Sequence, residues 1–209
     1  MSVCIHYWAI PPQSTLYARL QEDRVFNVLM ASFFTHDCGI YTFADLDPKE
    51  VEKVQEHITE RNRAALGPKR EARGRIGEFL AEVERTRIGF PGIERRTAML
   101  EKCGPEIEEH LTDALRTGRA DAAELTQKLI FGDKLLAPHL RKKGEDILGL
   151  VSQSLVREGA TILQRLKPEA LFPSEEDWAE WCRDNYSDLR EAYLAAAGHG
   201  EEILVGVSA

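Results

Sequence analysis

Long apolar runs and a leader segment are the first features that this sequence lacks. No stretch approaches the roughly eighteen consecutive apolar residues of a membrane-spanning helix. The first residues, MSVCIHYWAIPPQ, carry no basic region before an apolar one. We therefore expect neither a membrane span nor a signal peptide, and we expect a cytoplasmic protein.

Paired cysteines and metal-binding spacings are missing too. The four cysteines, Cys4, Cys38, Cys103 and Cys182, form no C-x-x-C pair. This scatter favours reduced thiols over a disulfide framework or a zinc site. The histidines show neither H-x-x-x-H nor H-E-x-x-H spacing, so we expect no metal site.

Signatures of the common enzyme classes are also absent. The chain has no G-x-G-x-x-G or G-x-x-x-x-G-K-[ST] loop for a nucleotide and no G-x-S-x-G for a serine hydrolase. We expect no cofactor, and the sequence favours a protein without enzymatic activity over an enzyme.

Basic residues are outnumbered: 27 Lys and Arg stand against 35 Asp and Glu, a formal net charge of −8. A protein that binds nucleic acid through its phosphates usually has the opposite balance, so we expect no nucleic-acid partner. Between residues 174 and 202, nine acidic residues face only Arg183 and Arg190. This segment is either a solvated helix face or an acidic surface that attracts a basic partner.

Two segments rich in β-branched or aromatic residues lie at the two ends of the chain. SVCIHYWAI, residues 2–10, ends at two prolines that cannot donate to a strand ladder, and EEILVGVSA closes the chain. A buried strand needs partners for its backbone groups. The sequence therefore predicts that residues 203–207 pair with residues 3–10, in a small sheet of which little faces water.

Helical periodicity fills most of the chain between these strands. The expected helices cover residues 13–30, 47–66, 104–118, 121–132, 152–166 and 174–198, and Ile76, Leu80 and Val83 share one face of a further charged segment. Residues 38–43 are a candidate short strand, and residues 67–75 are the best candidate for a mobile connection. These elements predict a single α+β domain over residues 1–209, mostly helical with a small sheet that pairs the N- and C-terminal strands.

The ends of two helices carry specific signals. Asp121 and Glu124 predict a capping box, whereas Ser174 and Gly198 predict the two ends of the last helix. One stripe of that helix carries Trp178, Trp181, Cys182, Leu189, Tyr193 and Ala196. The stripe indicates a central packing element.

The C-terminal part, residues 167–208, combines a proline-marked turn, an acidic helix with tryptophan, the pattern L-x-x-x-Y-x-x-A-A-x-x-G and a closing strand. The residues that carry these features are Leu171, Phe172, Pro173, Trp178, Leu189, Tyr193, Ala196, Gly198, Gly200 and residues 203–207. In these features the segment resembles the end of the YfbM-like family, bacterial proteins that carry a domain of unknown function. Upstream, LTDALRTG and LTQKLIFGD look like two further helix ends of the family, and SVCIHYWAI resembles its opening strand.

This chain departs from the family pattern in two places. The tryptophan and histidine that precede the family's Leu-Thr-Gly turn are absent, and only His110 is nearby. Residues 25–104 have no clear counterpart, which indicates a divergent or inserted helical segment. The resemblance implies an α+β fold and no established activity.

Three residues are the candidates for catalysis. His36 lies two positions before Cys38, where a positive imidazole could lower the pKa of the thiol. His6, on the first predicted strand, shares a face with Cys4 and Trp8. Free cysteines are more often buried apolar residues, and His6 fits a core position better than a catalytic one.

The last helix supplies the candidates for partner binding. Its first turns carry Trp178 and Trp181 together with Glu175, Glu176, Asp177 and Glu180. Aromatic anchors inside a charged rim are typical of protein interfaces, although the helical spacing of the tryptophans favours core packing. The sequence thus predicts a binding protein of immunity type, which caps a basic toxin or effector, or an assembly protein. The alternative is an enzyme whose Cys and His residues come from distant segments.

Overall fold

A five-stranded antiparallel sheet lies at the centre of the molecule. The computed structural model describes residues 4–34, 53, 56, 69–93, 96–136 and 147–208. The strands are β1 (Cys4–Ile10), β2 (Thr97–Glu101), β3 (Lys134–Leu135), β4 (Ile147–Val151) and β5 (Glu202–Ser208), in the order β2-β1-β5-β4-β3. The fold is therefore α+β, as the sequence predicts.

The predicted pairing of the chain ends is confirmed. β1 and β5 run antiparallel from Cys4 opposite Ser208 to Ile10 opposite Glu202. β5 also pairs with β4, so the closing strand is the middle strand of the sheet and not one half of an isolated hairpin. The sequence analysis missed β2, β3 and β4, because short apolar runs have no periodicity that separates strand from helix.

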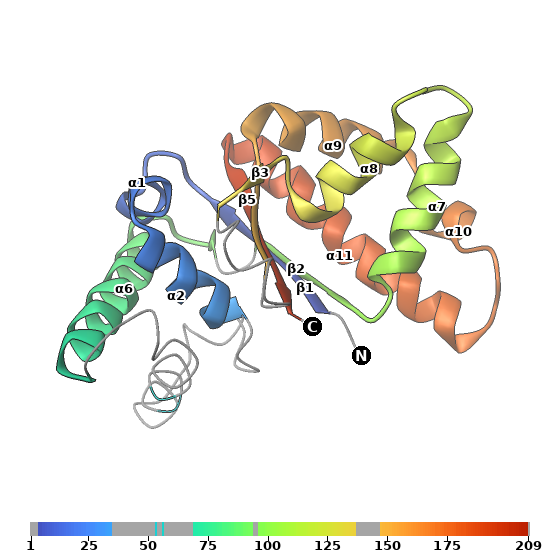
Figure 1. Ribbon diagram of the computed structural model, residues 1–209. Coiled ribbons are helices and arrows are strands. Elements are labelled where there is room, and N and C mark those ends of the chain that lie inside the picture. Colours follow the sequence, from blue (N-terminus) through green and yellow to red (C-terminus); the bar gives the residue numbers. More distant parts are fainter. Residues whose placement is uncertain are drawn as a thin grey trace.

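Helices cover both faces of the sheet (Figure 1). One face carries α7 (Gly104–Arg116), α8 (Ala122–Phe131), α9 (Gln153–Arg165), α10 (Pro168–Leu171) and α11 (Asp177–His199), and the other carries α1 (Thr15–Glu22), α2 (Arg24–Phe34) and α6 (Lys69–Gly89). Side chains of β1 alternate between the two layers: Ile5, Tyr7 and Ala9 pack with the first set, and Trp8 and Ile10 with the second. Little of the sheet faces water, as expected.

Two predicted elements on the α1–α6 side need correction. The single helix expected over residues 13–30 is divided into α1 and α2 at Asp23, whose Oδ1 accepts a hydrogen bond from the backbone N–H of Val25 at 2.9 Å. Residues 69–75 belong to α6 and are not a connection, because Ile76 and Phe79 anchor that helix in the core. The strand predicted over residues 38–43 and the helix over 47–66 lie outside the described residues, apart from helical Lys53 and Glu56.

Predicted helix ends also shift. The Asp121 side chain makes no capping bond, because the Arg119 guanidinium holds its carboxylate at 2.8 and 2.9 Å. α11 begins at Asp177, three residues after Ser174, and the Ser174 hydroxyl accepts a hydrogen bond from the backbone N–H of Glu176. The helix ends one residue beyond Gly198, and Gly200 forms its C-cap at φ +68°, a left-handed conformation that suits glycine.

Three buried tyrosines join the helices of the α7–α11 layer. The hydroxyls of Tyr7 and Tyr193 donate to the carbonyls of Ile130 and Leu129 at 3.0 and 2.5 Å, and Tyr186 donates to two carbonyls at the end of α9. These carbonyls lie in or beside last helical turns, where the helix itself offers no donor. Burial raises the pKa of all three hydroxyls, so they stay protonated and able to donate.

Membrane-spanning helices were also sought in the described ranges. None of the helices there combines the length and apolarity that crossing a bilayer requires.

Candidate functional site

The first two turns of α11 present two tryptophans to solvent. Trp178 and Trp181 are each 44% exposed, whereas Cys182 is 1% exposed. The predicted core packing is thus wrong for these two residues. Trp178 continues the buried row of Cys182, Tyr186 and Leu189 one turn beyond the point where the core ends.

Trp181 is held in place by the turn between β2 and α7. Its indole Nε1 donates to the carbonyl of Glu101 at 3.2 Å. The Asn185 side chain, one helical turn later, accepts a hydrogen bond from the N–H of Glu101 at 2.9 Å. At the centre of the turn, Lys102 adopts φ +61°, and Cys103 closes it by donating its N–H to the Glu101 carbonyl at 2.7 Å. The Trp181 ring is therefore ordered before any ligand arrives, which lowers the entropic cost of binding.

Four exposed carboxylates surround the tryptophans: Glu175, Glu176, Asp177 and Glu180. Within the described part of the chain, none of the four takes part in an ion pair. Negative charge near a helix N-terminus is favourable, which is one structural reason for these residues. The neighbouring Arg183 donates to the carbonyls of Phe172 and Ser174 at 2.7 and 2.6 Å.

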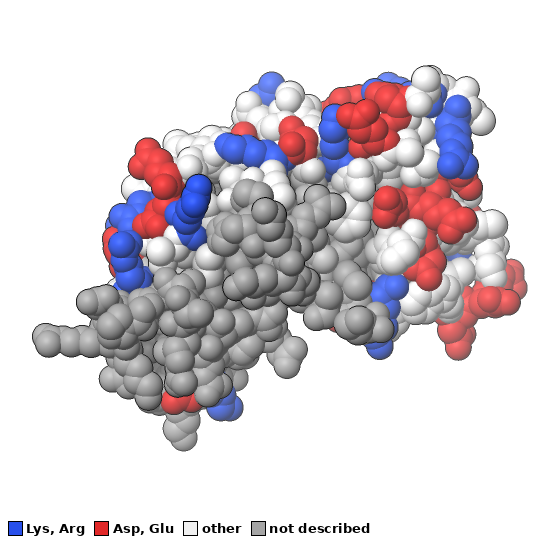
Figure 2. Space-filling view, in the orientation of Figure 1, with Lys and Arg blue, Asp and Glu red and all other residues white. Residues whose placement is uncertain are grey.

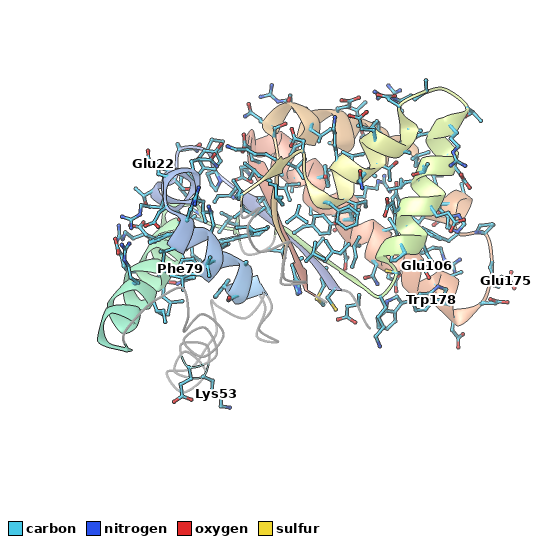
Figure 3. All side chains as sticks on the ribbon, viewed as in Figure 1. Glu22, Lys53, Phe79, Glu106, Glu175 and Trp178 are labelled. Atoms are coloured by element: carbon cyan, nitrogen blue, oxygen red, sulfur yellow. The ribbon has the colours of Figure 1, made fainter. Side chains whose placement is uncertain are left out.

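We refer to Trp178, Trp181, Glu175, Glu176, Asp177 and Glu180 as the acidic tryptophan surface. Figure 2 shows acidic side chains gathered over the end of the molecule that carries α7, α10 and the start of α11, with basic ones interspersed. In Figure 3, Glu175 and Trp178 lie at this same end, far from Glu22 on α1. Lys102 lies at the adjoining turn and is exposed.

Two thiols lie beneath this surface. Cys103 and Cys182 are 0% and 1% exposed, and both belong to the core of the α7–α11 layer. Burial raises the pKa of the Cys103 thiol to about 12, and the neighbouring Cys182 and the Glu106 carboxylate add to this rise. Burial and Glu106 also raise the pKa of Cys182. Neither thiol is therefore a ready nucleophile at neutral pH.

A charged pocket of about 280 Å³ lies between α8 and the start of α9, separate from the acidic tryptophan surface. Its groups are already paired with each other: Arg119 bridges Asp121 and Glu158, and Lys128 meets Glu124 at 2.6 Å. The fourth carboxylate in the pocket, that of Asp133, accepts hydrogen bonds from the N–H and hydroxyl of Ser152 and so caps α9. This pocket is explained by its own structural bonds.

Of the three catalytic candidates, the described part of the chain contains only His6. His6 lies half-buried on β1, opposite Met99 and Gly206, and burial lowers the pKa of its imidazole. Cys38 and His36 lie outside the described residues. No group of three or more His, Cys, Asp or Glu residues suited to a metal ion occurs among the residues that the structure describes.

The sequence analysis named the residues of the acidic tryptophan surface and placed Cys182 on the same stripe of the helix. It did not connect Cys103 or Glu106 with them, although both influence the pKa of the Cys182 or Cys103 thiol. No motif marks either residue.

Comparisons with protein-family models, curated proteins and solved structures found no match to this chain. The resemblance of residues 167–208 to the YfbM-like family therefore stays a prediction.

Proposed function

We propose that the protein is a non-enzymatic binding module that docks a basic partner protein on the acidic tryptophan surface. An immunity-type inhibitor of a basic effector, or a subunit of an assembly, would use such a surface in the same way. We place this function in the cytoplasm, without nucleic acid as a partner.

One observation carries the proposal: two half-exposed tryptophans lie within a rim of carboxylates that form no ion pairs among the described residues. Tryptophan is among the residues most enriched in interface hot spots, where it contributes a large apolar area with little loss of side-chain entropy. The Glu101 carbonyl already orients the Trp181 indole. Docking therefore requires little rearrangement of this ring.

The rim determines which partner fits. Carboxylates at the start of α11 attract a positively charged surface, which raises the association rate and disfavours acidic competitors. The partner that matches is thus a protein with Lys or Arg around an apolar centre. An Arg of the partner can also stack on either indole.

The experiment is a quantitative pull-down from the protein's native cells with matched variants. Trp178→Ala/Trp181→Ala removes the anchors, and Ile88→Ala removes an apolar side chain that is 65% exposed on α6, away from the surface. We expect a basic protein that wild type and Ile88→Ala retain and the double variant loses. Recovery of the same proteins by all three would contradict the proposal.

Charge is tested by a second pair of variants. Glu175→Lys reverses a charge on the surface, and Glu22→Lys reverses an exposed charge on α1 (Figure 3). We expect only the first to reduce retention of the basic partner, with the difference shrinking as salt is added. Equal retention by the two variants would remove the electrostatic part of the proposal.

The alternative, an enzyme with Cys38, His36 and His6 at its site, stays a prediction. The described residues contain no observation that favours it, because only His6 is among them.

A further inference from the structure

Lys102, in the β2–α7 turn, has a strained backbone conformation. Its φ of +61° is the only positive φ of a non-glycine residue among the residues that the structure describes. The N–H of Cys103 donates to the carbonyl of Glu101, two residues earlier, at 2.7 Å, so Lys102 is the central residue of a γ-turn. A γ-turn with positive central φ is the strained form, which glycine or asparagine adopts more easily than lysine. Lysine therefore costs stability at this position.

The fold explains why this turn is tight but not why its central residue is lysine. Cys103 is 0% exposed, and a Cβ on Gly104 would lie 2.9 Å from Ile5 Cδ1, so the chain enters the core directly after the turn. The Lys102 side chain itself is exposed and forms no ion pair within the described ranges of the chain. Strained residues are concentrated at functional sites. The charge of Lys102 is thus available to a partner.

Two contacts from α11 fix the turn beside the acidic tryptophan surface. The Glu101 carbonyl accepts the Trp181 indole N–H at 3.2 Å, and the Glu101 N–H donates to Asn185 Oδ1 at 2.9 Å. Because Lys102 follows Glu101 directly, its backbone has a fixed position relative to Trp181. The guanidinium of the nearby Arg183, in contrast, donates to two backbone carbonyls. Lys102 is therefore an uncommitted positive charge at the border of this surface.

We propose that Lys102 is a specificity-determining residue of the acidic tryptophan surface and pairs with an acidic side chain of the basic partner. The inference rests on the proposed function, because it concerns how the same partner is recognised. A partner that is basic throughout would bring Lys or Arg against the Lys102 ammonium, and this repulsion disfavours it. A partner with one Asp or Glu at the corresponding position gains an ion pair instead. The surface thus selects a pattern of charges and not positive charge alone.

Removal of the Lys102 charge separates this proposal from simple attraction between opposite charges. Without Lys102 the surface is more acidic, so a uniformly basic partner should bind more tightly. A partner that pairs a carboxylate with Lys102 should instead bind less tightly, by about two- to fivefold for an exposed ion pair. The two cases differ in the direction of the change.

The experiment measures, by isothermal titration calorimetry, how Lys102 variants bind the basic protein that wild type retains. Lys102→Gly and Lys102→Asn remove the charge and accept a positive φ, and we expect both to bind about two- to fivefold more weakly. Lys102→Arg keeps the charge and should bind like wild type. Lys134→Gln removes an exposed charge on β3, at the opposite edge of the sheet, and is the control that should not change binding.

Stability is measured on the same variants and needs no partner. We expect Lys102→Gly to raise the urea midpoint, because glycine relieves the strain of the turn. A higher midpoint together with weaker binding would show that lysine serves the partner and not the fold. Equal or tighter binding by Lys102→Gly and Lys102→Asn would overturn the proposal. The proposed function fails in a different way, if Trp178→Ala/Trp181→Ala binds as tightly as wild type.

A second test uses the wild-type complex. A carbodiimide couples an amine to a carboxylate that already touches it, and peptide mass spectrometry locates the resulting amide. We expect an amide between Lys102 Nζ and an Asp or Glu of the basic partner. Cross-links from the partner's lysines to the carboxylates of the acidic tryptophan surface, with none from Lys102, would support the proposed function and overturn this inference.

Discussion

The two halves of α11 use aromatic residues in opposite ways. In the second half, Tyr193 is 0% exposed, and its hydroxyl donates to the Leu129 carbonyl of α8. In the first two turns, Trp178 and Trp181 are each 44% exposed. The same helical spacing therefore serves the core at one end and solvent at the other.

The neighbours of the helix cause this difference. The second half packs between α9 and the sheet. The first two turns lie at the end of the core, where Trp181 contacts the β2–α7 turn and Arg183 contacts the segment before the helix. An aromatic residue stabilises the fold only where other side chains surround it. The exposed tryptophans add little to stability and are available to a partner.

The largest expected effect comes from Tyr193→Ala in the buried half. Losing a fully buried aromatic ring should lower the free energy of unfolding by about 3–5 kcal/mol. Tyr193→Phe is the matched control: it keeps the ring but leaves the Leu129 carbonyl without its donor, which costs about 1–3 kcal/mol. Urea denaturation measures both. Equal losses in the two variants would show that the hydroxyl, and not the packing, dominates.

Gly159→Ala probes the same half from the side of α9. A Cβ at this position would lie 2.6 Å from Leu129 Cδ2 and 2.7 Å from Tyr193 Cε1. We expect a loss of about 1–3 kcal/mol from overpacking, read from the urea midpoint. In contrast, a Cβ on Gly74 of α6 would meet nothing within 4 Å, so Gly74→Ala should stabilise by about 0.5–1 kcal/mol through its helix propensity. If Gly159→Ala left the urea midpoint unchanged, the buried half of α11 would be packed as loosely as its exposed half.

Glu106→Gln tests how charge affects the two buried thiols near the exposed end of α11. Burial is the main cause of the raised pKa of Cys103, about 12, and of Cys182, and the Glu106 carboxylate adds to both. Removing its charge favours the thiolate, so the pKa of both thiols should fall and iodoacetamide should alkylate them faster at pH 8, by up to about tenfold per pKa unit. Glu109→Gln, an exposed position on the same helix, is the control that should not change the rate. A rate that also stays constant in Glu106→Gln would show that burial alone sets the reactivity.

The smallest expected effect on stability belongs to the exposed tryptophans. Trp178→Ala should lower the free energy of unfolding by less than about 1 kcal/mol, because the ring already meets solvent. Trp181→Ala should cost slightly more, since it also loses the bond to the Glu101 carbonyl. A loss comparable to that of Tyr193→Ala would place these rings in the core and erase the difference between the halves.

The pairing of the N- and C-terminal strands could be predicted from the sequence. Each strand needed a hydrogen-bonding partner, and each was the clearest candidate partner for the other. The sequence analysis missed β2 and β4, which are five-residue segments whose position in the sheet depends on β1 and β5. It also continued the stripe of α11 through Trp178, because periodicity identifies a helix face but not where the covering layer stops. The bond between the Trp181 indole and the Glu101 carbonyl joins two elements far apart in the chain, and no spacing rule predicts it.

Isothermal titration calorimetry of the recovered basic partner tests the central claim most directly. Trp178→Ala/Trp181→Ala should weaken binding by at least about 2 kcal/mol, roughly 30-fold, as expected for hot-spot residues. Ile88→Ala, on the opposite layer, should bind like wild type. Equal dissociation constants for wild type and the double variant would contradict the assignment of this surface to partner binding.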